Sequence, residues 1–164
     1  VAKTLISTFQ SGNKLLICGN GGSAADSQHL AAEFVSSFSA GLKRKSLPAI
    51  SLMVDTSVIS AISNDFGYES VFARQVEGLG APGDALLLIS TSGESRNCLR
   101  ALEVAKKTGM KCLALTSKGS KLYKETDSAI GVSSKNTQYI QECHVIAYHI
   151  LADLVDQFFT EATE

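Results

Sequence analysis

Short apolar runs alternate along this chain with longer segments in which apolar residues recur at helical spacing. Each run is too short for a helix, is rich in aliphatic residues, and ends at glycine or at small polar residues. The runs span residues 14–18, 49–52, 84–89, 111–115 and 129–132. We predict that these segments are buried strands.

The longer segments have the pattern of helices. They cover residues 23–38, 56–63, 70–79, 96–108 and 137–159, and Gly109 follows the fourth as a helix-ending residue. No element is predicted ahead of residue 14, and residues 118–121 are predicted to form a turn. Continuous apolar strands that alternate with helices are typical of a parallel sheet covered on both faces. We therefore expect a single domain over residues 1–164 with an open α/β sandwich fold.

The composition excludes several classes of function. The chain has 164 residues, of which 45% are hydrophobic and 19% charged, and its net charge is −1. This balance gives no basis for a nucleic-acid partner. The apolar runs fall far short of the roughly 20 residues that span a bilayer, and no secretory signal opens the chain. We expect a cytoplasmic protein without a membrane partner.

The cysteines give no sign of a metal or redox centre. Cys18, Cys98, Cys112 and Cys143 are widely spaced, and no CxxC pair occurs. We predict buried free thiols, and the alternatives are disulfides or a thiolate metal site.

Two loops rich in glycine and hydroxyl groups follow predicted strands. They are Gly19-Asn-Gly-Gly-Ser23 and Ser90-Thr-Ser-Gly-Glu-Ser95. Ligands of a parallel sheet bind beyond the carboxyl ends of its strands, where hydroxyls and the N–H groups of a starting helix favour a phosphate. The nucleotide pattern GxxxxGKS or GxxxxGKT is absent, and the first loop departs from GxGxxG. The alternative is that these loops only cap helices.

Several segments together resemble the SIS (sugar isomerase) domain and, within it, the phosphoheptose isomerase family. The resemblance runs from Leu15 to about Phe158. It is carried by Cys18-Gly-Asn-Gly-Gly-Ser-Ala-Ala-Asp26, His29-Leu-Ala-Ala-Glu-Phe34, Ser63-Asn-Asp-Phe-Gly67, Ile89-Ser-Thr-Ser-Gly93 with Ser95, and Ile140-Gln-Glu142 with His149. The family implies conversion of sedoheptulose 7-phosphate to D-glycero-D-manno-heptose 7-phosphate, the first committed step toward the heptoses of bacterial lipopolysaccharide or capsule. It also implies a homotetramer with active sites at subunit contacts.

Moving a carbonyl between C2 and C1 of a sugar phosphate needs a base, an acid and an electrophile. His29 and Glu33 are four residues apart on a predicted helix, so they share a face as a metal site or an acid/base couple would require. By resemblance, Glu33 is the general base and His149 the general acid. The family's zinc ligands correspond to His29, Glu33, Gln141 and His149. Its substrate ligands correspond to Asn20, Gly21, Gly22, Ser23, Glu33, Asn64, Asp65, Ser90, Thr91, Ser92, Ser95 and Gln141.

Three of these assignments have alternatives. Gln141 and His149 are about 12 Å apart along a continuous helix, so we expect neighbouring subunits to complete the site, with the division of ligands left open. His149 stands in an apolar stretch, so the alternative is that it is a hydrogen-bonded core histidine. For Asn64 and Asp65, the alternative to substrate binding is a helix-ending turn. His144 is given no role.

The chain departs from the family in places. Ser37 stands where many members have an arginine that contacts the substrate, and Gln138 stands where some have a carboxylate. We interpret Lys43, Arg44 and Lys45 as a solvated loop, and the alternative is that one of them replaces the missing charge. The sequence opens at Val1 without an initiator methionine. Family members usually carry a further N-terminal helical segment used in assembly, so truncation is one interpretation.

Three other functions compete with this isomerase. One is a non-catalytic SIS protein resembling the DnaA-associating protein, a type that lacks the equivalents of Glu33 and His149. A second is a sugar-phosphate-sensing domain of a transcription factor, which no DNA-binding extension supports. A third is an isomerase of another sugar phosphate.

Overall fold

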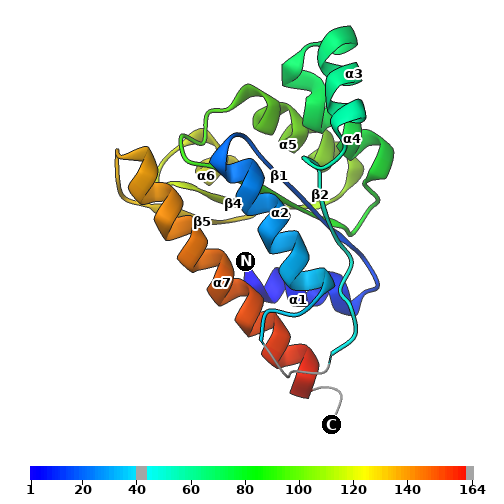
Figure 1. Ribbon diagram of the computed structural model, residues 1–164, viewed down its shortest axis with the longest axis vertical. Coiled ribbons are helices and arrows are strands. Elements are labelled where there is room, and N and C mark those ends of the chain that lie inside the picture. Colours follow the sequence, from blue (N-terminus) through cyan, green and yellow to red (C-terminus); the bar gives the residue numbers. More distant parts are fainter. Residues whose placement is uncertain (40–43, 162–164) are drawn as a thin grey trace.

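Five parallel strands form one sheet at the centre of the protein (Figure 1). The computed structural model describes residues 1–39 and 44–161. The strand order is β2-β1-β3-β4-β5, and the strands are β1 Leu15–Gly19, β2 Ala49–Ser51, β3 Ala85–Ser90, β4 Lys111–Ser117 and β5 Ser128–Val132. All neighbouring pairs are parallel. Each predicted strand is confirmed, with ends shifted by one or two residues.

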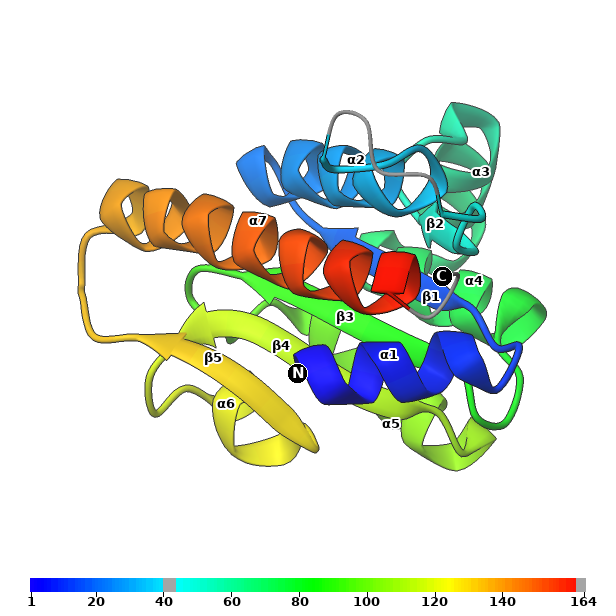
Figure 2. The same cartoon turned by 90° about the horizontal axis from the view of Figure 1, so that it is seen from below.

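Helices cover both faces of the sheet (Figure 2), which confirms the predicted α/β sandwich. One face packs against α1, α2 and α7, and the other against α4, α5 and α6. Helix α3 packs on α4 and on the short 3-10 turn η1. The bounds are α1 Ala2–Gln10, α2 Gly22–Val35, α3 Thr56–Phe66, η1 Tyr68–Ser70, α4 Val71–Leu79, α5 Arg96–Thr108, α6 Lys121–Glu125 and α7 Thr137–Glu161.

The strands are mostly apolar because each side of the sheet has its own core. Leu15 and Ile17 of β1 pack with α2 and α7, whereas Leu16 and Cys18 pack with α4 and α5. Alternate residues of a strand point to opposite faces, so a strand covered on both faces has few polar positions. This pattern explains why the strands could be predicted from short continuous runs.

The four cysteines are free thiols. Cys18, Cys98 and Cys112 are buried as predicted, but the prediction is wrong for Cys143, which is exposed on α7. Burial raises the pKa of Cys18 well above its ordinary value and raises the pKa of Cys112 to about 11. These two thiols are therefore poor nucleophiles.

Several local predictions are wrong. Helix α1 occupies the segment given no element, because Leu5 and Phe9 lie four residues apart and both enter the core. Helix α2 ends at Val35 and not at residue 38. Helix α3 continues to Phe66, so Asn64 and Asp65 lie inside it and do not form a turn; Gly67, at φ 80°, follows its end. Helix α6, after the predicted turn, was not anticipated.

Among the described residues, none of the helices has the length and apolar character needed to cross a membrane.

Candidate active site

The two predicted phosphate loops lie side by side. Strands β1 and β3 are neighbours, and Gly19 is in register with Ile89, so the loops that follow them emerge at the same edge of the sheet. In the loop after β3, Ser90 Oγ lies 3.1 Å from Ser95 Oγ and accepts a hydrogen bond from the Gly93 backbone N–H at 3.1 Å. Helix α5 begins directly afterwards. The loop therefore presents hydroxyls and helix-start N–H groups at one place, as an oxyanion requires.

Asn20 ties the two loops together. Its side-chain amide exchanges hydrogen bonds with Asn97 at 2.9 and 2.8 Å, and its Oδ1 also accepts one from the Tyr68 hydroxyl at 2.9 Å. The structure thus gives the Asn20 side chain a bracing role beside the predicted ligand role. Asn97 and Tyr68 were missed in the sequence, where no local pattern distinguishes them from ordinary helix residues.

Gln141 of α7 lies against the start of α2. A Cβ atom on Gly22 would fall 2.2 Å from Gln141 Nε2, so any larger residue there would force the Gln141 amide to move. Gln141 Nε2 donates to Asp26 Oδ2 at 3.1 Å. Burial raises the pKa of Asp26, although Gln141 and His29 act in the opposite direction. The predicted ligands Gly22 and Gln141 are therefore brought together at the loop end of α2.

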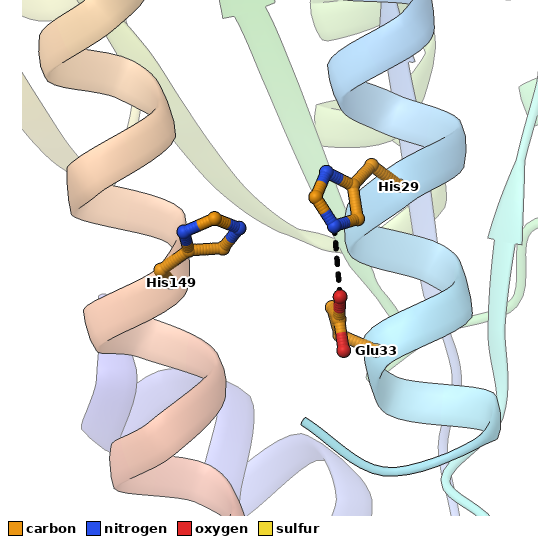
Figure 3. A group of neighbouring side chains, drawn as sticks. All are labelled: His29, Glu33 and His149. Carbon is orange, nitrogen blue, oxygen red and sulfur yellow. Dashed lines mark hydrogen bonds and ion pairs between the residues drawn. The ribbon is translucent and has the colours of Figure 1, made fainter. Parts of the chain in front are cut away.

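His29, Glu33 and His149 converge between α2 and α7 (Figure 3). His29 Nε2 lies 2.8 Å from Glu33 Oε1, and the rings of His29 and His149 are 5.1 Å apart between centroids. One ligand atom from each side chain falls within 4.8 Å of the other two. Two imidazoles and a carboxylate are the donors that zinc accepts in catalytic sites, so the chemistry and spacing of this trio fit a metal ion. The same side chains also suit proton transfer.

Comparisons with known proteins identify the family of the chain. A family model described as "SIS domain" matches residues 1–117. A phosphoheptose isomerase from a Nitratiruptor species is 54% identical over 155 residues, which cover 94% of this chain and 82% of that protein. One from Helicobacter pylori is 52% identical over 156 residues, covering 94% and 80%. The chain belongs to the phosphoheptose isomerase family. A solved structure of a phosphoheptose isomerase from Francisella tularensis has a TM-score of 0.90 at 39% identity, covering 95% of this chain and 83% of that one.

The direction of α7 explains how Gln141 and His149, eight residues apart on this helix, both face α2. Helices α2 and α7 run parallel, because Gln141 meets Asp26 near the start of α2 while His149 meets His29 further along. Within one chain, Gln141 therefore serves the loop end, and His149 joins His29 and Glu33. The geometry leaves the fourth predicted zinc ligand one turn of α2 away from the trio.

Asn64 and Asp65 stand apart from the trio. Both are exposed in the last turn of α3, where Asn64 Nδ2 donates to Asp65 Oδ1 at 2.8 Å. Helix α3 buries none of its residues. These two predicted sugar ligands are linked to the loops only through the following turn, from which Tyr68 reaches Asn20.

Arg44 does not replace the arginine that this family often has at the position of Ser37. The Arg44 side chain is fully buried, so the interpretation as a solvated loop is wrong for this residue. Its guanidinium bonds Asp156 Oδ1 at 2.5 Å and the carbonyl oxygens of Glu33 and Phe34 at 2.8 and 2.9 Å. Lys45 is exposed, as expected of a loop, and Lys43 lies outside the described residues.

Asp156 fixes the segment that leaves α2. Its Oδ2 accepts hydrogen bonds from the Phe38 and Ser39 backbone N–H groups at 2.8 and 3.2 Å and from Ser37 Oγ at 3.2 Å. The Phe38 ring then lies 5.4 Å from the His149 ring. Phe38 thus lies beside the site, and Asp156 holds the segment that carries it. An aspartate within a long helix gives no such signal in sequence.

Proposed function

We propose that the protein converts sedoheptulose 7-phosphate to D-glycero-D-manno-heptose 7-phosphate. The convergence of Glu33, His29 and His149 carries the proposal, since it supplies a base, an acid and a site for an electrophile at one place. Glu33 removes a proton from C1, which leaves an enediolate, and a proton returns to C2. His149 transfers protons at the two oxygens: O2 gains a proton and O1 loses one. Bond order moves from the C2 carbonyl to C1, and no atom is lost.

The separation of the two parts of the site suits a long substrate. Helix α2 rises about 10 Å between Gly22 at the loops and His29 at the trio. The phosphate and the reacting carbonyl of a heptulose 7-phosphate stand at opposite ends of its open chain. This separation supports a sugar of that length over a shorter one.

We propose zinc as the electrophile, held by His29, Glu33 and His149 with Gln141 as a further ligand. When bound, the ion would polarise the substrate oxygens and stabilise the enediolate charge. The protein's own contribution is to hold the imidazoles and the carboxylate on two parallel helices, within 4.8 Å of each other. Because Gln141 of the same chain is bonded to Asp26, we propose that a neighbouring subunit supplies the fourth ligand.

An apolar stripe on α7 supports assembly into a homotetramer. Ile146, Ile150, Leu154 and Phe158 recur every four residues, and their exposed fractions are 61, 55, 45 and 36%. A contiguous exposed apolar stripe of this kind marks an interaction surface. His149 of the trio belongs to the same helix as this stripe, so subunit contacts through α7 would lie beside the site. In the cell we place the enzyme in the cytoplasm, supplying heptose for lipopolysaccharide or capsule.

The deciding experiment is turnover of sedoheptulose 7-phosphate by the purified protein, with and without added zinc. Glu33→Gln should lower turnover by a factor on the order of 10²–10⁴, the usual contribution of a positioned base. Substrate binding through the loops should persist in that variant. Absence of turnover in the unsubstituted protein under all conditions would refute the isomerase and favour a binding role, whereas equal turnover in the variant would remove Glu33 from the mechanism.

A further inference from the structure

The phenol of Tyr148 meets the side of His29 that faces away from the site. Tyr148 precedes His149 on α7 and is only 1% exposed. Its hydroxyl lies 3.1 Å from His29 Nδ1, while Nε2 of the same ring lies 2.8 Å from Glu33 Oε1. Both nitrogens of His29 are therefore engaged, one by a neutral hydroxyl and the other by a carboxylate.

The partners of the two nitrogens indicate which of them carries the proton in each state of the site. A neutral imidazole has one N–H donor and one acceptor. If the phenol donates to Nδ1, the proton resides on Nε2, which then donates to the Glu33 carboxylate. If Nε2 instead binds a cation, the proton must reside on Nδ1, and the phenol oxygen accepts it. A hydroxyl can take either part by rotation, so the ring keeps one orientation in both states.

The Tyr148 ring contacts both histidines of the trio. It packs edge-on against His29 at 5.5 Å and against His149 at 4.8 Å, with interplanar angles of 76° and 85°. Phenylalanine would provide the same packing, because these contacts involve the ring alone. The hydroxyl therefore has a role that core packing does not explain.

We propose that Tyr148 is a positioning residue, whose hydroxyl holds Nδ1 of His29 so that Nε2 faces Glu33 and the metal site. The inference rests on the proposed site between α2 and α7, but it is independent of which sugar the enzyme converts. It assigns to the phenol the outer hydrogen bond that metal-binding histidines usually make to a carboxylate, a carbonyl or water.

The test is the tautomer of His29, measured by ¹⁵N NMR on the metal-free protein at about pH 8.5, two units above the ordinary pKa of a free imidazole. The unsubstituted protein should show His29 as a single tautomer with the proton on Nε2. Tyr148→Phe should shift the Nδ1 signal of His29, because that nitrogen loses its hydrogen-bond donor. A mixture of both tautomers in the unsubstituted protein would overturn the proposal without recourse to any variant, and so would unchanged His29 signals in Tyr148→Phe.

Zinc affinity gives a second measurement, by competition with a chromogenic chelator. Tyr148→Phe should bind zinc roughly 10–100-fold more weakly, the usual effect of losing an outer hydrogen bond. Tyr123→Phe is the matched control, because Tyr123 belongs to α6 on the opposite face of the sheet. Equal zinc affinity in the Tyr148 and Tyr123 variants would overturn the proposal. Neither measurement depends on turnover. A failure of this inference can therefore be told apart from a failure of the proposed function, which turnover tests.

Discussion

At the scale of single residues, the loop after β3 makes the sharpest prediction for substrate binding. Ser92 is exposed. Its Oγ accepts a hydrogen bond from the Glu94 backbone N–H at 3.2 Å and lies 3.5 Å from Ser90 Oγ. Ser92→Ala should weaken binding of the phosphorylated sugar by about 1.5–3 kcal/mol, the effect of losing a hydrogen bond to a charged oxygen. Isothermal titration with the substrate measures this change.

Ser60→Ala is the control for that substitution. Ser60 is also exposed, but its hydroxyl donates to the Ser57 carbonyl within α3. The affinity of the Ser60→Ala variant for the phosphorylated sugar should equal that of the unsubstituted protein. If both variants bound equally well, the loop would not be the phosphate site.

His144 makes a prediction about stability against pH. It is fully buried, and neither ring nitrogen has a hydrogen-bond partner among the described residues. Burial lowers the pKa of His144, and the nearby backbone of Thr116 only partly opposes this effect. The unfolded chain therefore accepts a proton that the folded chain refuses. The free energy of unfolding should fall as the pH drops below about 6.5, until the folded-state pKa is reached.

Urea unfolding at a series of pH values checks this expectation, with His144→Leu as the comparison. Leucine cannot titrate, so the variant should lose less stability between about pH 7 and pH 5. Identical slopes in the two proteins would show that other groups cause the acid sensitivity.

At the scale of secondary-structure elements, the C-terminal end of α2 depends on the pair Arg44 and Asp156. Both side chains are fully buried, and the guanidinium satisfies two carbonyls of the last helical turn. Asp156→Asn should lower the free energy of unfolding by about 3–5 kcal/mol, because it leaves a buried charge without its partner. Denaturant unfolding provides the measurement.

Glu77→Gln is the matched control for a salt bridge. Glu77 pairs with Arg74 at 3.6 Å, but the two side chains are 66 and 48% exposed. Exposed pairs contribute about 0–1 kcal/mol, so this variant should unfold almost normally. A loss as large as that of Asp156→Asn would contradict the distinction between the two pairs.

The same elements show what could be predicted from sequence. The strands were found because coverage on both faces makes most of their positions apolar. The end of α2 was missed because it depends on Asp156, far away in the chain. Within the site, His29 and Glu33 share a helix face by spacing alone, and the family motif added His149. Tyr148 resembled an ordinary core aromatic, since its partner His29 is close only in space.

At the scale of the whole molecule, the α7 stripe predicts the oligomeric state. Ile150→Glu places a charge in the middle of the stripe, where a subunit contact would bury it, so the proposed tetramer should dissociate into smaller species. Sedimentation velocity measures the change. Lys107→Glu, an exposed substitution on α5 at the opposite face of the sheet, should leave the mass unchanged. Equal masses for all proteins would exclude α7 as the contact surface.

The parallel placement of α2 and α7 also orders events during synthesis. His29 and Glu33 leave the ribosome early, whereas His149 lies in the last helix of the described chain. Until α7 docks, the sheet face that it covers is open and the pair on α2 lacks its third partner. Capture of the proposed metal would therefore require synthesis of α7, and a nascent chain that still lacks this helix should not sequester the ion.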